Sequence, residues 1–278
     1  MKSFDYSTDP HFTALLNRSP EVNHVGINCE IAQEFDPSVR LASVQSWLDK
    51  RAEEIRPEIL QTHDQRRQLQ VLAAHLGGQW GLHGDRLAYM RPEASFVSHV
   101  IESGIGLPIS LALIYISVGA RLGIELEGIG APHHFLCRYE GIDETLYLDA
   151  YNPGRLMSTR ECIQWLSNLA DLSPAQVQQR LNPVTDRDFV IRQLNNLKQL
   201  FLSHDNWEAA WKVQRRLSTL TPGSFLERRD LALIALKSDH PGLAVDLLKE
   251  VIPAAPENEQ PILKTHLQNA LSEVSRWN

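Results

Sequence analysis

The chain has 278 residues, a length that favours two domains over one. Of these residues, 43% are hydrophobic and 22% are charged, which is the composition of a soluble globular protein. No apolar run reaches the roughly 18 residues of a membrane span, and the first residues lack the apolar segment of a signal peptide. We therefore expect a cytoplasmic protein with no membrane role. The net charge of −7 falls on residues 1–185, because residues 186–278 are electrically balanced. Without a basic stripe, nucleic-acid binding is disfavoured.

The first hundred residues are predicted to be helical. Apolar residues recur at helical spacing over 28–34, 41–55, 65–80 and 95–102. Gly104 is expected to end the last of these helices, as a C-terminal cap glycine does. Pro108 suits the first turn of the next helix, which continues to Arg121. That helix is apolar nearly all round, so we expect it to be buried.

Three strands with period-two patterning follow, over 124–129, 135–139 and 145–149. Helices should then begin at the capping box of Ser158 and at Ser173, which precedes a proline. The order of helices, core helix, small antiparallel sheet and closing helices defines an α+β domain over residues 1–183.

Residues 184–278 are predicted to be all-α, with paired helices and no strand signal. Two pairs start about 36 residues apart, close to the repeat of about 34 residues in tetratricopeptide-type solenoids. Such helices present a concave face to a peptide or protein. On this face Lys212, Arg215 and Arg216 are candidate partner-binding residues, with an acidic segment as their ligand.

His134 and Asp149 are the candidate site residues. They lie on successive strands joined by a hairpin, a spacing that brings a base and an acid side by side. Three alternatives to a catalytic base and acid stay open. In the first, His134 is a core histidine with its hydrogen bonds satisfied; in the second, the pair is a purely structural ion pair; in the third, Asp149 belongs to the turn that follows it.

Neither a metal nor a cofactor is expected. The three cysteines show no CxxC spacing, and no glycine-rich phosphate loop is present. Three residues are candidate nucleophiles, and each has an argument against it. Ser110 faces away from Pro108 on the helix, Cys137 lies on the opposite strand face to His134, and Cys162 reads as packing in an amphipathic helix.

Three segments carry a family resemblance: GIGLPISLALIY (104–115), RLGIELEGIGAPHHFLCR (121–138) and LDAYN (148–152). They are similar to the bacterial transglutaminase-like family typified by the SirB-one protein. The resemblance implies a papain-like, transglutaminase-like α+β domain followed by tetratricopeptide-type helices. It also implies that His134 and Asp149 are the family histidine and aspartate. Set against true transglutaminase cores, Pro108 lies where the nucleophilic cysteine would be. Family members tend to have glycine at the position of His133.

These observations favour a non-catalytic regulatory protein, a pseudoenzyme that binds a protein or peptide partner. Proline has no nucleophilic atom, so the site retains a base and an acid without a reactive group. The alternative is a hydrolase or acyl-transferase that uses the His134–Asp149 pair with an unexpected nucleophile or with water.

Overall fold

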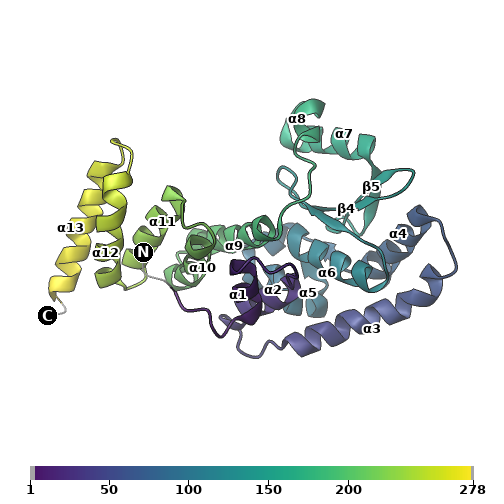
Figure 1. Ribbon diagram of the computed structural model, residues 1–278, viewed down its shortest axis with the longest axis horizontal. Helices are drawn as coiled ribbons and strands as arrows, with labels where there is room; N and C mark the ends of the chain where they lie inside the picture. The colour runs from purple at the N-terminus through teal and green to yellow at the C-terminus, as the bar shows by residue number, and fades with distance from the viewer. Residues whose placement is uncertain (1–3, 277–278) are drawn as a thin grey trace. The chain divides into compact units, whose positions relative to one another are not determined.

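The computed structural model describes residues 4–276, which form two compact units (Figure 1). One unit comprises His11–Gln193; within the described residues, the other joins residues 4–10 to residues 194–276. The division falls inside a continuous helix, α9 (Asp186–Ser203). The domain boundary expected after residue 183 stays a prediction about which part of the chain folds alone.

Helices form most of the first half of the larger unit. They are α1 (Pro10–Leu16), α2 (His24–Gln33), α3 (Leu41–Ile59), α4 (Gln65–Ala73) and α5 (Val97–Ser103). The helix expected over 65–80 stops at Ala73 and widens into a π-helical segment, η1 (Ala74–Gln79). Gly77 lies within this segment, and a Cβ there would lie 2.7 Å from the carbonyl carbon of Pro153. Only glycine, which has no Cβ, allows the two backbone segments to come this close.

A short parallel pairing leads into the central helix. Two 3₁₀ turns, η2 (Arg86–Met90) and η3 (Pro92–Ser95), separate β1 (His83–Gly84) from α5. Gly104 caps α5 at φ 77°, and β2 (Ile105–Gly106) then pairs with β1. The buried helix α6 (Pro108–Arg121) begins at the proline, as the sequence predicts.

A four-stranded antiparallel sheet packs on α6. It runs β3 (Glu127–Ile129), β4 (Leu136–Glu140), β5 (Thr145–Asp149) and β6 (Arg155–Ser158), each beside its neighbour in sequence. Three of the strands were expected. The fourth, β6, follows a turn whose proline and glycine indicate a loop.

Helices cover both faces of this sheet. Figure 1 shows α7 (Thr159–Ala170) and α8 (Pro174–Gln178) on one side of it and α6 on the other. Leu136, Tyr147 and Met157 form a core with α7 and α8. From the opposite face, Cys137 Sγ lies 3.7 Å from the carbonyl oxygen of Ala112 in α6. The capping box expected at Ser158 is present at the start of α7.

The second unit contains helices without strands in its described part. After α9 come α10 (Trp207–Leu220), α11 (Phe225–Lys237), α12 (Pro241–Val251), a 3₁₀ turn η4 (Ile252–Ala254) and α13 (Gln260–Arg276). From α10 to α13, each helix packs on the next. Tetratricopeptide-type repeats stay a prediction. None of the helices within residues 4–276 has both the length and the apolar character needed to cross a membrane.

Candidate functional site

Two adjacent histidines at the entry to β4 take opposite environments. The backbone N–H of His134 donates to the carbonyl of Ala131 at 3.2 Å, which closes a turn just before the strand. His133 adopts φ 56° and is exposed, whereas His134 is 7% exposed. A positive φ favours glycine, so His133 adopts a backbone conformation that residues with side chains rarely take. The turn directs only the second histidine inward.

His134 and Asp149 are in contact. His134 Nε2 lies 2.8 Å from Oδ1 of Asp149, and the carboxylate is completely buried. The contact follows from the antiparallel pairing of β4 with β5, since Asp149 is the last residue of β5 and His134 stands just ahead of β4. The structure therefore brings together the two residues that the sequence pairs. Their catalytic role stays a prediction.

The Asp149 carboxylate is oriented by the turn that follows it. Its Oδ1 accepts hydrogen bonds from the backbone N–H groups of Tyr151 and Asn152, at 3.1 and 3.3 Å, and its Oδ2 accepts one from Asn152 Nδ2 at 2.7 Å. Pairing with His134 and membership of the turn are thus compatible, because Asp149 is both the partner of His134 and the first residue of the turn. Burial alone would raise the pKa of Asp149, but its hydrogen bonds with His134 and Asn152 and the charge of His134 lower it below the usual value.

Aromatic rings enclose the imidazole on two sides. Tyr151 and Trp165 lie edge-on to it, with ring centroids 5.7 and 5.1 Å away. From α9, Arg192 Nη2 donates to the backbone carbonyls of Ala131 and His134 at 2.9 and 2.7 Å, which holds the turn in place.

Sequence reasoning missed Asn152, Trp165 and Arg192. Asn152 lies within the LDAYN motif, three residues after Asp149, but Trp165 and Arg192 come from distant helices with no local signal.

The start of α6 lies at the same end of the sheet as this pair. Gly84 is in register with Gly106, two residues before Pro108, and its backbone N–H donates to the carbonyl of Tyr151 at 2.8 Å. A Cβ at Gly84 would overlap the Tyr151 ring, so the glycine permits this packing. Pro108 occupies the first helical position of α6 and offers no side-chain donor, acceptor or nucleophile.

No candidate nucleophile reaches the imidazole. Within residues 4–276, Asp149 is the sole hydrogen-bond partner of the His134 ring. The Ser110 hydroxyl donates instead to the backbone carbonyls of Ala94 and Leu107, at 2.6 and 3.0 Å.

All three thiols are buried. Cys137 faces α6, and Cys162 of α7 lies in the core between that helix and the sheet. Burial raises the pKa of Cys137 far above its usual value and raises the pKa of Cys162 to about 12. Burial likewise raises the pKa of Cys29 to about 12. Thiols that stay protonated are poor nucleophiles.

The partner-binding assignment of Arg216 is wrong. This side chain is 1% exposed, donates to Asp9 Oδ2 at 2.7 Å, and stacks over the Tyr6 ring at 4.9 Å. A partner-binding residue has to be accessible, but Tyr6 and Asp9 cover Arg216. Arg215 stacks on aromatic rings, and Lys212, like Arg215, is partly exposed. A partner-binding role for Lys212 and Arg215 stays a prediction.

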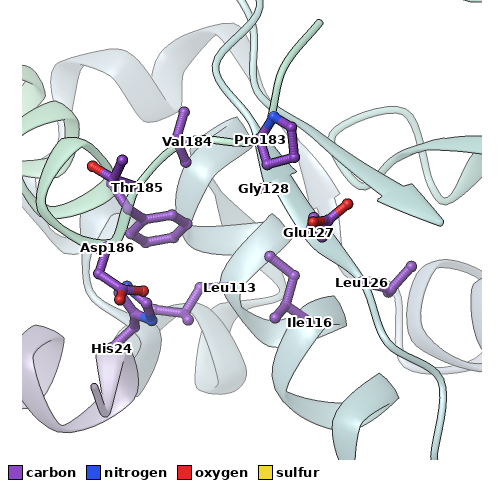
Figure 2. A pocket seen from close by; sticks show the side chains of 11 residues that line it. His24, Leu113, Ile116, Leu126, Glu127, Gly128, Pro183, Val184, Thr185 and Asp186 are labelled. Carbon is purple, nitrogen blue, oxygen red and sulfur yellow. The ribbon is translucent and has the colours of Figure 1, made fainter. Parts of the chain in front are cut away.

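A second histidine–aspartate pair lines a small cavity of about 210 Å³ (Figure 2). His24 Nε2 lies 3.2 Å from Asp186 Oδ1 at one end, and Leu113 and Ile116 of α6 form part of the wall. Burial lowers the pKa of His24, and Asp186 acts in the opposite direction. The His24 ring also packs on Phe189, at 4.8 Å between centroids. These contacts join α2 to the start of α9 and read as structural. Across the described residues, no three histidine, cysteine or acidic side chains come together as a metal site.

Comparisons with known proteins agree with this architecture. The family model described as the transglutaminase-like superfamily matches residues 42–195. A UPF0162 protein of Xylella fastidiosa (strain Temecula1) is 32% identical over 197 residues, which cover 69% of this chain and 70% of the relative. No solved structure matches the chain.

More distant relatives extend over most of the sequence. A UPF0162 protein of Vibrio cholerae is 26% identical over 248 residues, covering 87% of this chain and 90% of its own length. The UPF0162 protein YchA of Escherichia coli (strain K12) is 24% identical over 243 residues, with 87% and 89% covered. The chain belongs to the UPF0162 family, whose core is a transglutaminase-like domain.

Proposed function

We propose that this protein is a non-catalytic regulatory protein that binds a protein or peptide partner, a pseudoenzyme built on a transglutaminase-like domain. One observation carries the proposal: within residues 4–276 the His134 imidazole hydrogen-bonds Asp149 and no hydroxyl or thiol. Covalent catalysis needs a nucleophile within hydrogen-bond reach of its base. The proposal also rests on Pro108, which begins α6 and has no nucleophilic atom, at the position that the family resemblance of the sequence aligns with a nucleophile.

The C-terminal helices are part of this proposal. We assign residues 184–278, which contain α9 to α13, to a tetratricopeptide-type region that presents a surface to the partner, in keeping with the SirB-one-type resemblance of the sequence. The packing of each helix on the next supports this assignment. Lys212 and Arg215 favour an acidic partner segment.

An alternative function is hydrolysis or acyl transfer by the His134–Asp149 pair acting on water or on an unexpected nucleophile. It is favoured by the intact pair itself. With Nε2 bound to Asp149, a neutral His134 carries its lone pair on Nδ1, as a general base requires.

A turnover assay separates the two functions. The purified protein is incubated with chromogenic ester and amide peptide substrates, beside the His134→Ala variant and the His133→Ala control. The binding role predicts equal background rates for all three proteins. A rate that disappears in His134→Ala and persists in His133→Ala would establish the enzyme instead.

A further inference from the structure

Two cavities adjoin between the C-terminal helices, both within the second unit. The larger has a volume of about 360 Å³ and the smaller one about 260 Å³. Leu236, Lys237 and His266 line both of them, so the two spaces meet at these side chains. The larger cavity falls within the range of roughly 300–1,000 Å³ that is usual for ligand sites.

The larger cavity is apolar. Leu202 of α9, Trp207 at the start of α10 and Leu233 of α11 contribute to its wall. All three side chains are half-buried, so part of their apolar surface stays accessible. A large apolar side chain of a ligand would leave water on entering this space, which is favourable.

The charges around the apolar cavity favour an anionic group at its boundary. Asp230, the acidic side chain in its wall, is already paired, since its Oδ2 accepts a hydrogen bond from Lys198 Nζ at 3.0 Å. Lys237 is exposed, and within residues 4–276 it makes no ion pair with a carboxylate. Its ammonium lies 6.0 Å from the centroid of the Trp207 ring. A ligand carboxylate placed where the two cavities meet would therefore find a cation with no competing partner.

The smaller cavity is lined by hydrogen-bonding groups. Besides the shared side chains, Asn269, Ser272, Glu273 and Arg276 of α13 form its wall. They supply both donors and acceptors, which a peptide backbone can use and the hydrocarbon chain of a lipid cannot. Glu273 and Arg276 carry opposite charges, so they leave the preference for an anion to Lys237. The two cavities together fit a peptide better than a lipid.

We propose that the apolar cavity takes a large apolar side chain of a partner peptide and that Lys237 pairs with an acidic side chain beside it. Lys212 and Arg215 of α10 are not found among the described residues that line either cavity. The partner segment is thus acidic, as the sequence suggests, but binds at a different place. This inference rests on the proposed binding function and adds to it the docking site and the chemistry of the partner.

Fluorescence polarisation with labelled eight-residue peptides tests the inference. Three sets carry a central leucine, phenylalanine or tryptophan, flanked by aspartate or glutamate in the first set, by asparagine or glutamine in the second and by lysine in the third. A fourth set is acidic and has serine at the centre. The full chain is compared with Lys237→Glu, with Lys212→Glu and with the control Lys264→Glu, which alters an exposed lysine of α13 outside both cavities.

We expect the wild type and Lys264→Glu to bind the first set most tightly. Serine at the centre should weaken binding by about 10- to 100-fold, because the apolar side chain is no longer buried. Lys237→Glu should bind the acidic peptides about 3- to 30-fold more weakly, since repulsion replaces an exposed ion pair, and should bind the lysine set best. A purely structural role of Lys237 would not reverse the preferred charge.

Four results would overturn the inference. They are no binding of any peptide set, equal binding of the first and fourth sets, an unchanged order of the sets in Lys237→Glu, and a reversal of the preferred charge in Lys212→Glu or Lys264→Glu.

The outcome is distinct from that of the turnover assay. Hydrolysis that depends on His134 would refute the proposed binding function and leave a Lys237-dependent preference for acidic peptides intact. A charge preference governed by Lys212 would refute the assignment to the two cavities and leave the proposed function standing.

Discussion

Replacing His134 with alanine should destabilise the protein, independently of any chemistry at the site. The substitution removes the hydrogen bond from Nε2 to a carboxylate that has no solvent exposure. Loss of one partner of a buried pair costs about 3–5 kcal/mol. Asp149 keeps three other donors, from Tyr151 and Asn152, so the lower end of this range, about 3 kcal/mol, applies. The corresponding fall in melting temperature is about 6–12 °C.

Urea unfolding followed by tryptophan fluorescence measures this loss. Trp165 is a local reporter because its ring lies 5.1 Å from that of His134. The matched control is His133→Ala, which alters the exposed neighbour and should change the free energy of unfolding by less than about 0.5 kcal/mol. A loss of under about 1 kcal/mol for His134→Ala, or an equal loss for both variants, would refute the buried pair as a source of stability.

Three further predictions concern other groups. Because the pKa of Asp149 is lowered in the fold, its stabilisation is present above its unfolded pKa of about 3.9 and is lost as pH falls through the native value. The difference in unfolding free energy between wild type and Asp149→Asn should therefore shrink below about pH 4, and a constant difference from pH 6 to 3 would contradict this. Iodoacetamide at neutral pH should label Cys137 and Cys162 slowly until urea unfolds the chain; rapid labelling with a midpoint below about pH 7 would show an activated thiol. Arg216→Ala should lower the free energy of unfolding by about 2 kcal/mol, less than a fully buried pair because Asp9 is partly exposed. Lys212→Ala should change it by under about 0.5 kcal/mol, and equal small effects of both variants would count against a structural role for Arg216.

Local chemistry explains which elements the sequence predicts well. The capping box at Ser158, the left-handed Gly104 and the first-turn Pro108 each act through neighbours within a few residues, and each lies where it was expected. The pairing of His134 with Asp149 is also accessible, since a hairpin converts a short sequence separation into adjacency.

Long-range packing explains what the sequence does not reveal. Whether Arg216 is solvated depends on Asp9 and Tyr6, which are more than two hundred residues away. Arg192 reaches the turn before β4 from a helix 58 positions along the chain. The close approach of Gly77, in the π-helical segment after Ala73, to Pro153 likewise has no local sequence pattern. Each of these contacts forms only when the chain folds and brings distant segments together.

The central proposal is that His134 and Asp149 belong to a transglutaminase-like site whose nucleophile position is occupied by Pro108. Introducing a thiol by Pro108→Cys tests the claim most directly, with iodoacetamide labelling from pH 5 to 9 as the measurement. A helix N-terminus and a neighbouring imidazolium both lower a thiol pKa. We predict fast labelling at pH 6 in Pro108→Cys and a marked loss of that rate when His134→Ala is added. Labelling no faster than that of an ordinary thiol with a pKa of about 8.5, or a rate indifferent to His134, would contradict the account.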